Sequence, residues 1–299
     1  MKDERIGRVR VLDNLATGFR KNIEHHFHDP RFEFMEGDIR NYDTCLQAAA
    51  GMDLICHQAA LGSVPRSINH PLTSNEVNVT GTLNIFTAAK ENSIKRVVYA
   101  ASSSTYGDHP ALPKVEDQIG NPLSPYAVTK LVNELYARVY ASSYGMEFIG
   151  LRYFNIFGPR QNPNGPYAAV IPLFAQALID GKSPTINGDG STSRDFTYVD
   201  NAVQANLLAL FTENKEALNQ VYNIACGKQT SLVELFDVLK AYLSAHINPT
   251  FGPERRGDVK HSLADIFKAK RLLGYKVLVG VEEGLRRTME WVEGRWIKV

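Results

Sequence analysis

The sequence lacks the features that would direct it into a membrane or out of the cell. No apolar run approaches the roughly 18 residues of a membrane-spanning helix, and the polar start MKDERIGR has no apolar core of a signal peptide. The three cysteines, Cys45, Cys56 and Cys226, are widely spaced and odd in number. We therefore expect each to be a buried, reduced thiol, and we expect the protein to be cytoplasmic.

The chain also lacks an excess of charge of either sign. Its 33 Lys and Arg and 32 Asp and Glu are interspersed and leave a formal net charge of +1. It has no basic stripe of the kind that binds nucleic acid or a membrane surface, so small molecules are the expected partners. His25, His26 and His28 have no further ligand at metal-site spacing, and we predict no metal centre.

Short apolar runs alternate with helical patterns through the first half of the chain. Residues 71–92 have the apolar spacing of one helix. Strands are predicted over residues 9–12, 32–35, 54–57, 96–101 and 148–153. Continuous apolar strands separated by helices are typical of a parallel sheet that is covered on both faces. The sequence therefore predicts an α/β fold with a doubly wound parallel sheet.

From Gly158 the chain contains more loops rich in Gly, Pro, Asn and Arg, such as PRQNPNGP, NGDGSTSRD and GPERRGD. Such loops often carry ligand contacts, although ordinary solvated connections are the alternative. With 299 residues, of which 44% are hydrophobic, the chain is long enough for two lobes. We predict one domain over residues 1–155 and a smaller lobe over residues 156–299, with some segments of this lobe returning to the sheet.

Tyr126 and Lys130, in SPYAVTK, lie just over one helical turn apart and follow the serine-rich segment AASSSTYG. On a shared helix face the ammonium could stabilise a phenolate, whereas the alternative is a surface pair four residues apart. Ser124 is a plausible N-cap, and Gly145 follows the helix end. We predict that an apolar face is buried, away from the pair, and that it consists of Val128, Leu131, Leu135 and Val139.

Polar or small residues follow the first predicted strands, where a doubly wound sheet forms its ligand crevice. Asp13 ends the first strand and could accept hydrogen bonds from an adenosine ribose, or simply start a turn. Asp38 could bond an adenine amino group or cap a helix. Behind the third strand, Gln58, Ala59 and Ala60 leave room for a flat cofactor, or they merely pack well.

A series of motifs along the chain resembles a known family. In order and spacing, the chain from about residue 9 to 290 resembles the extended short-chain dehydrogenases that act on nucleotide sugars, the NAD-dependent epimerase/dehydratase family. The strongest likeness is to bacterial UDP-N-acetylglucosamine 4-epimerases. The motifs are LDNLATG, GDIR, HQAALGSVPRS, AASSSTYGDHPALPK, SPYAVTK, GLRYFNIFGPRQNPNG, NGDGSTSRDF and RRGDVKHS.

The resemblance implies roles for individual residues. Tyr126 is implied as the acid/base tyrosine, with a pKa lowered by Lys130 and by the oxidised nicotinamide. Ser102, with help from Ser103, is implied to bond the same sugar oxygen. The fold is implied to be of the NAD-binding Rossmann type. Residues implied to hold NAD are Asp13, Asn14, Asp38, Ile39, Gln58, Ala59, Ala60, Tyr126, Lys130 and Tyr153.

The resemblance also implies a UDP-sugar site in the second lobe and beside it. Its implied residues are Ser63, Arg66, Ser103, Asn155, Arg194, Arg255, Asp258 and Ser262. Related 4,6-dehydratases carry Asp and Glu beside the serine, whereas this chain has Ser103, Ser104 and Thr105, which favours epimerisation. Ser262 stands where 4-epimerases restricted to small sugars carry tyrosine, so it leaves space for an N-acetyl group. We expect 4-epimerisation of UDP-N-acetylglucosamine and UDP-N-acetylgalactosamine through a 4-keto intermediate.

The family's opening strand and Gly-rich turn, which hold the NAD pyrophosphate, have no counterpart in this sequence. The first domain is therefore expected to be truncated at its N-terminus, and we expect a strand, turn and helix of about 35 to 45 residues upstream of Met1. Without the central strand, the strands beginning at Val9 and Leu54 are left with unpaired edges or must pair directly.

Two alternatives stay open at this point. One is a UDP-glucose 4-epimerase, and the other is a non-catalytic relative that binds a nucleotide sugar without holding NAD firmly. Relatives often dimerise through helices that correspond to residues 71–92 and 126–143, so a homodimer is also possible.

Overall fold

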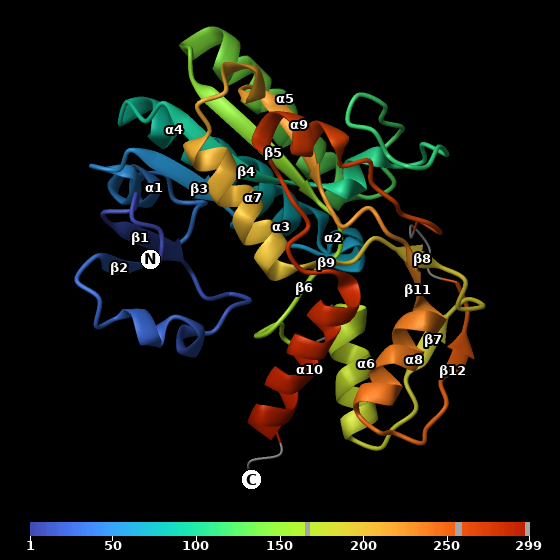
Figure 1. The fold of residues 1–299 in the computed structure, drawn as a ribbon. Helices are drawn as coiled ribbons and strands as arrows, with labels where there is room; N and C mark the ends of the chain where they lie inside the picture. The colour runs from blue at the N-terminus through green and yellow to red at the C-terminus, as the bar shows by residue number, and fades with distance from the viewer. Residues whose placement is uncertain (165–167, 255–258, 297–299) are drawn as a thin grey trace.

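The structure is a computed structural model that describes residues 1–164, 168–254 and 259–296 (Figure 1). Its main sheet has four parallel strands in the order β10-β5-β4-β3. These strands are β3 (Leu54–His57), β4 (Arg96–Ser102), β5 (Glu147–Tyr153) and β10 (Gln220–Ile224). The predicted parallel α/β architecture is confirmed.

Helices cover both faces of this sheet (Figure 1). On one face, Phe86 and Tyr140 pack with Tyr99 and Phe148 of the sheet, and on the other face Ala205 and Ala269 pack with Ile149 and Leu151. The first face carries α1 (Tyr42–Ala49), α4 (Thr82–Glu91) and α5 (Pro125–Tyr144), and the second carries α7 (Val199–Phe211) and α9 (Phe267–Leu273). The sheet is therefore buried on both sides, as its nearly continuous apolar strands require.

β1 (Val9–Asp13) and β2 (Phe32–Glu36) form a separate parallel pair. Among the described residues, neither strand pairs with β3, so of the two expected outcomes the structure has unpaired edges rather than direct pairing. β3 is the edge strand of its sheet, and its Cys56 is exposed, although we expected a buried thiol there. Cys45 is buried and Cys226 is partly buried, and all three cysteines are unpaired.

The helix predicted over residues 71–92 is continuous but contains an irregularity. α3 (Pro71–Asn75) leads into a π-helical segment, η3 (Glu76–Gly81), which continues as α4. At Gly81 a side chain would lie 2.5 Å from Cδ1 of Ile39, so the absent Cβ lets Ile39 pack closely against the helix. The close contact joins the loop after β2 to the helix layer.

α5 begins and ends as predicted but turns the opposite face to the sheet. Ser124 caps its first turn by accepting a hydrogen bond from the backbone N–H of Ala127 (3.2 Å), and Gly145 ends it with a left-handed φ of 65°. The predicted burial of its apolar face is wrong, because Val128, Leu135 and Val139 are 48%, 50% and 54% exposed. The buried face instead contains Ala127, Thr129, Lys130, Asn133, Glu134 and Ala137.

The smaller lobe has its own apolar core, in which Phe157, Ile171, Phe174, Ile186 and Phe236 are buried. Its helices are α6 (Val170–Ile179), α8 (Leu232–Tyr242) and α10 (Val281–Trp296). Its short strand pairs are β6 (Ile156–Phe157) with β9 (Thr197–Tyr198), β7 (Thr185–Asn187) with β12 (Thr250–Gly252), and β8 (Ser193–Arg194) with β11 (Thr230–Ser231). The chain also returns to the main sheet in α7, β10 and α9, and α10 packs against the second core.

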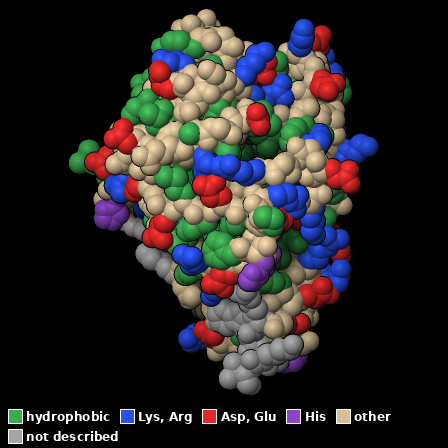
Figure 2. All heavy atoms as spheres, turned by 90° about the vertical axis from the view of Figure 1, so that its left-hand side faces the viewer, with side chains coloured by type: hydrophobic (Ala, Val, Ile, Leu, Met, Phe, Trp, Pro, Cys, Tyr) green, Lys and Arg blue, Asp and Glu red, His purple; other side chains and the backbone are tan. Residues whose placement is uncertain are grey.

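The remaining helical segments are short, and the surface charge is mixed. They are η1 (Arg20–Asn22), η2 (Glu24–His26), α2 (Val64–Asn69), η4 (Ser103–Tyr106) and η5 (Lys215–Ala217). Figure 2 shows basic and acidic side chains interspersed over one face, with no broad area of one sign. No helix in the described part of the chain has the length and apolarity needed to cross a bilayer.

Candidate active site

A cluster of hydroxyl groups forms where β4 ends. The Oγ of Ser102 accepts hydrogen bonds from the backbone N–H of Ser104 (3.1 Å) and from its hydroxyl (2.8 Å). Tyr126, in the first turn of α5, lies close enough to the same serine for the Ser102 hydroxyl to lower its pKa. The structure therefore places Tyr126 beside Ser102, and their catalytic roles stay a prediction. The side chain of Ser103 has no hydrogen bond within the described residues, and Ser104, to which we assigned no site role, is the serine that contacts Ser102.

Burial is the main influence on the acidity of Tyr126. Burial raises the pKa of its hydroxyl, and the hydroxyl of Ser102 lowers the pKa by a smaller amount. The charge of Lys130 is not among the causes of this shift, whereas the lowering that the resemblance implies also requires the oxidised nicotinamide and stays a prediction. The Nζ of Lys130 lies 6.0 Å from the centre of the Tyr126 ring.

Lys130 lies beneath the hydroxyl cluster and is only 3% exposed, which rules out the alternative of a surface pair. Its Nζ donates a hydrogen bond to the backbone carbonyl of Ala100 (2.8 Å). Burial lowers its pKa from 10.5 to about 8. Nearby, burial and then the charge of Lys130 lower the pKa of His57 to about 3, so this imidazole is neutral and bonds Thr82 (2.9 Å).

The residues predicted to bind adenosine lie where β1 and β2 end, and a hydrogen bond joins two of them, Asn14 and Asp38. The side-chain amide of Asn14 donates to Asp38 (2.9 Å), and Arg40 donates to both carboxylate oxygens of Asp38 (3.0 and 2.8 Å), which lowers the pKa of Asp38. One oxygen of Asp13 accepts from the backbone N–H of Leu15 (2.6 Å), as the turn alternative requires. Ile39 does not join them, because its side chain is buried in the core.

The ends of β3 and β5 are linked by Asn206 of α7, a residue we did not single out from the sequence. Its amide nitrogen donates to the hydroxyl of Tyr153 (2.7 Å), and its oxygen accepts from the amide of Gln58 (3.1 Å). Ala59 and Ala60 follow Gln58 in the loop after β3. The helical periodicity around Asn206 contains no signal for this role, since Tyr153 and Gln58 lie more than 50 residues away.

Several predicted UDP-sugar residues lie in loops or at the ends of short elements. Ser63 caps α2 by accepting from the backbone N–H of Arg66 (3.3 Å). Asn155, with a left-handed φ of 39°, lies between β5 and β6. Arg194 of β8 donates to the backbone carbonyls of Ser193 (3.0 Å) and Lys260 (3.2 Å). Arg255 and Asp258 lie outside the described residues.

Ser262 is 9% exposed and lies beside β8, where its backbone N–H donates to the carbonyl of Ser193 (3.1 Å). Its hydroxyl is buried and has no partner within residues 1–164, 168–254 and 259–296. A buried hydroxyl without a partner is costly, so a group that bonds it would be favoured.

Asp195, which follows Arg194, holds these loops together and was not predicted. Its carboxylate accepts backbone N–H bonds from Cys226 (2.9 Å), Gly227 (3.0 Å) and Ala264 (3.2 Å). Burial raises the pKa of Asp195 to about 6, against the effect of these bonds. The carboxylate thereby connects the loops after β8 and β10 to the segment that contains Ser262.

The polar side chains at two strand-end clusters suit the two ends of a dinucleotide. Asp13 and Asn14 lie at one strand-end cluster, and Ser102, Tyr126 and Lys130 lie at another. No Gly-rich turn follows a strand in the described residues. No group of three potential metal ligands occurs in the part of the chain that the structure describes.

The burial of Lys130 predicts a specific pH dependence of stability. Because its folded pKa of about 8 lies below 10.5, the unfolded chain binds the proton more tightly, and stability rises with pH between these values. In Lys130→Met the rise in folding stability that comes from this lysine, on the order of 3 kcal/mol between the two pKa values, should disappear. Urea unfolding of both proteins at pH 7 to 10, without added nucleotide, measures the difference. Lys270→Met, on exposed α9 surface, is the control, and a difference that does not change with pH would contradict the assignment.

The chain is similar to several known proteins. The chain matches the NAD dependent epimerase/dehydratase family over residues 2–225. It is 35% identical over 286 residues to the UDP-glucose 4-epimerase of Mycolicibacterium smegmatis, covering 95% of this chain and 90% of that protein.

Two solved structures are also similar to the chain. The UDP-N-acetylglucosamine 4-epimerase from Methanobrevibacter ruminantium M1, in complex with UDP-N-acetylmuramic acid, has a TM-score of 0.90 and 39% identity, covering 96% of this chain and 91% of that chain. The UDP-glucose 4-epimerase of Thermus thermophilus, in complex with NAD, has a TM-score of 0.85 and 32% identity, with the same coverage of 96% and 91%. The chain has the Rossmann-type fold of these proteins and belongs to the NAD-dependent epimerase/dehydratase family.

Proposed function

We propose that this protein catalyses the NAD-dependent 4-epimerisation of a UDP-hexose, and that UDP-N-acetylglucosamine and UDP-N-acetylgalactosamine are its substrates. The observation that carries the proposal is the joining of Ser102 and Tyr126 at the end of β4, with Lys130 buried beneath them. The 4-epimerase names of the similar proteins support the reaction type.

The residues of this chain would handle the proton and the orientation of the sugar. Tyr126 accepts the proton of the sugar 4-hydroxyl and returns it to the 4-keto intermediate after the sugar has turned over. Ser102 bonds the same oxygen, and the positive charge of Lys130 favours the phenolate. Bound NAD supplies reversible hydride acceptance at C4. Since the chain alone raises the pKa of Tyr126, the charge of the oxidised nicotinamide is needed to lower it.

Epimerisation is favoured over dehydration by the residues that follow Ser102. Elimination of water needs an acid and a base beside the sugar, whereas Ser103, Ser104 and Thr105 supply only hydroxyls. The hydroxyl of Thr105 also donates to the carbonyl of Ser102 (2.8 Å), so it is already engaged.

Removing the Tyr126 hydroxyl tests the reaction. Tyr126→Phe should lower the epimerase rate by at least about 100-fold, because general acid–base catalysis contributes that much or more. The rate is measured by the interconversion of UDP-N-acetylglucosamine and UDP-N-acetylgalactosamine with NAD present. Tyr144→Phe removes an exposed hydroxyl from the same helix and should leave the rate unchanged. A Tyr126→Phe enzyme with more than a tenth of the original rate would exclude this acid/base role.

The preference for an N-acetylated sugar rests on Ser262, whose small side chain and unpartnered hydroxyl suit an N-acetyl group. Ser262→Tyr should lower kcat/KM for UDP-N-acetylglucosamine at least about tenfold more than for UDP-glucose, since it fills the volume. Ser262→Ala keeps the volume and should have a smaller effect. Equal losses on both sugars would refute the role of this position.

A UDP-glucose 4-epimerase is the second candidate, and the names of relatives favour it. Assays of the unmodified protein on both sugars separate the two. A third reading is a relative that binds nucleotide sugars without firmly holding NAD. Bound NAD that gains NADH-like fluorescence with a UDP-sugar would exclude that reading, whereas sugar binding without the cofactor would support it.

We also propose a homodimer formed by the exposed apolar face of α3 and α5. This face consists of Leu72, Val128, Leu135 and Val139, which are 48% to 78% exposed. Val139→Glu should halve the mass found by sedimentation equilibrium, because it places a charge in the proposed interface. Val203→Glu, at an exposed valine of α7, should leave the mass unchanged. A monomeric unmodified protein would overturn the proposal.

The division of the chain and its location are proposed on the same basis. Residues 1–155 would form the dinucleotide-binding domain, and residues 156–299 would mainly form the substrate-binding lobe, whose separate apolar core supports the division. The three unpaired cysteines suit the reducing cytoplasm.

A further inference from the structure

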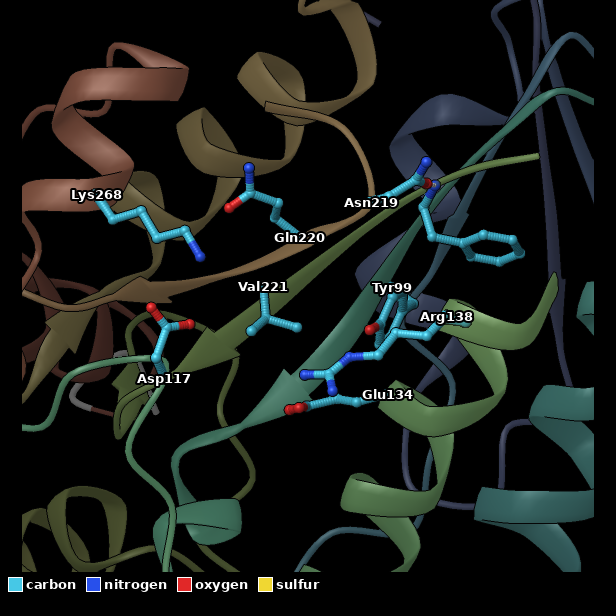
Figure 3. Close-up of a pocket in the computed structure, with 10 residues that line it drawn as sticks. Tyr99, Asp117, Glu134, Arg138, Asn219, Gln220, Val221 and Lys268 are labelled. Carbon is cyan, nitrogen blue, oxygen red and sulfur yellow. Dashed lines mark hydrogen bonds between the residues drawn. The ribbon is translucent and has the colours of Figure 1, made fainter. Parts of the chain in front are cut away.

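A cavity of about 230 Å³ lies at the β10 edge of the main sheet, on the face covered by α5 (Figure 3). Residues from six parts of the chain line it, including Tyr99, Glu134, Arg138, Val221 and Lys268. The cavity reaches toward the start of β5 and β10, whereas the hydroxyl cluster lies where β4 ends. It is therefore separate from the proposed sugar site.

The floor of the cavity carries a buried hydroxyl. Tyr99, Gly150 and Val221 lie in register on β4, β5 and β10. Because Gly150 has no side chain, Tyr99 extends across β5, and a Cβ at Gly150 would lie only 2.6 Å from the Tyr99 hydroxyl oxygen. Figure 3 shows this oxygen directed into the cavity.

The Tyr99 hydroxyl is suited to a ligand. Tyr99 is 2% exposed, and no residue in the described ranges forms a hydrogen bond with its hydroxyl. Burial raises its pKa, so the group stays protonated and can donate. Because the hydroxyl opens into the cavity and has no partner among the described residues, a ligand oxygen at this position can accept its hydrogen bond.

The walls carry an excess of positive charge. Arg138 of α5 and Lys268 of α9 form no salt bridge within the described residues, and Figure 3 shows both side chains reaching toward the cavity from opposite sides. Glu134 is neutralised by Arg152, which donates to both of its oxygens (2.8 and 2.7 Å). The Nζ of Lys268 also lies 5.4 Å from the centre of the Tyr222 ring, and its charge acts on Glu116. Asp117 is the other carboxylate of the lining, so in the described residues the cavity has two cations without a salt bridge against one such anion.

We propose that this cavity binds a small organic anion, a phosphate ester or carboxylate that also carries hydroxyl groups. Arg138 and Lys268 bind the anionic group, Tyr99 donates to one of its oxygens, and Asp117 accepts from a hydroxyl. The volume corresponds to about eight water molecules, which is more than a bare phosphate fills.

Titration calorimetry of the full chain tests the site with glycerol 3-phosphate and with malate as probes, and with glycerol as the uncharged comparison. We expect saturable binding of at least one anionic probe and none of glycerol. Arg138→Gln and Lys268→Gln should each weaken this binding about tenfold, and Tyr99→Phe about threefold or more. Lys270→Gln removes an exposed cation from the same helix as Lys268 and should not change it.

Two further measurements separate a ligand site from a structural role or from the sugar site. The thermal midpoint of Tyr99→Phe without probe should equal or exceed that of the original protein, because the hydroxyl has no partner to lose. UDP should not displace the bound probe. If only glycerol 3-phosphate binds, the natural ligand is a phosphate ester, and if only malate binds, it is a carboxylate. Absence of saturable binding, insensitivity to Arg138→Gln and Lys268→Gln, or displacement by UDP would each overturn the proposal.

Discussion

The buried ion pair between Arg152 and Glu134 sets the position of α5, on which the candidate active site depends. Both side chains are 1% exposed, and Arg152 also donates to the backbone carbonyl of Glu116 (2.9 Å). A charge buried without its partner would be strongly destabilising. The pair therefore requires the polar face of α5 to pack against the sheet. Lys130 lies one turn before Glu134 on that face, and Tyr126 one turn earlier still. The ion pair therefore aligns the helix whose first turn meets Ser102.

A second buried carboxylate organises the opposite side of the site. Asp195 has no exposed surface and accepts three backbone N–H bonds from segments that are distant in sequence. Loops that lack regular structure are thereby fixed relative to β8 and to Ser262. Glu134 and Asp195 thus act in the same way, because each is a buried carboxylate whose hydrogen bonds position loops and helix ends of the candidate site.

The sheet itself explains how the proposed dinucleotide contacts are divided. Asp13 and Asp38 are held by the pair β1 and β2, whereas Ser102 and Tyr153 end strands of the four-stranded sheet. The structure shows no backbone pairing between these units in the described residues. Their polar strand ends are nevertheless at the carboxyl ends of parallel strands, which is where an α/β sheet binds its ligand.

The sequence alone determined the alternation of strands and helices, the caps of α5, and the placement of Asp13, Asp38 and Ser102 at strand ends, because these depend on local periodicity and capping. It also identified Tyr126 and Lys130 as neighbours on a helix. Only the tertiary structure decided which face of α5 is buried, since the partner of Glu134 comes from β5 and not from the helix. The same holds for the raised pKa of Tyr126, the linking roles of Asn206 and Asp195, and the cavity beneath Arg138. Each depends on desolvation or on contacts between segments far apart in the chain, which no local pattern encodes.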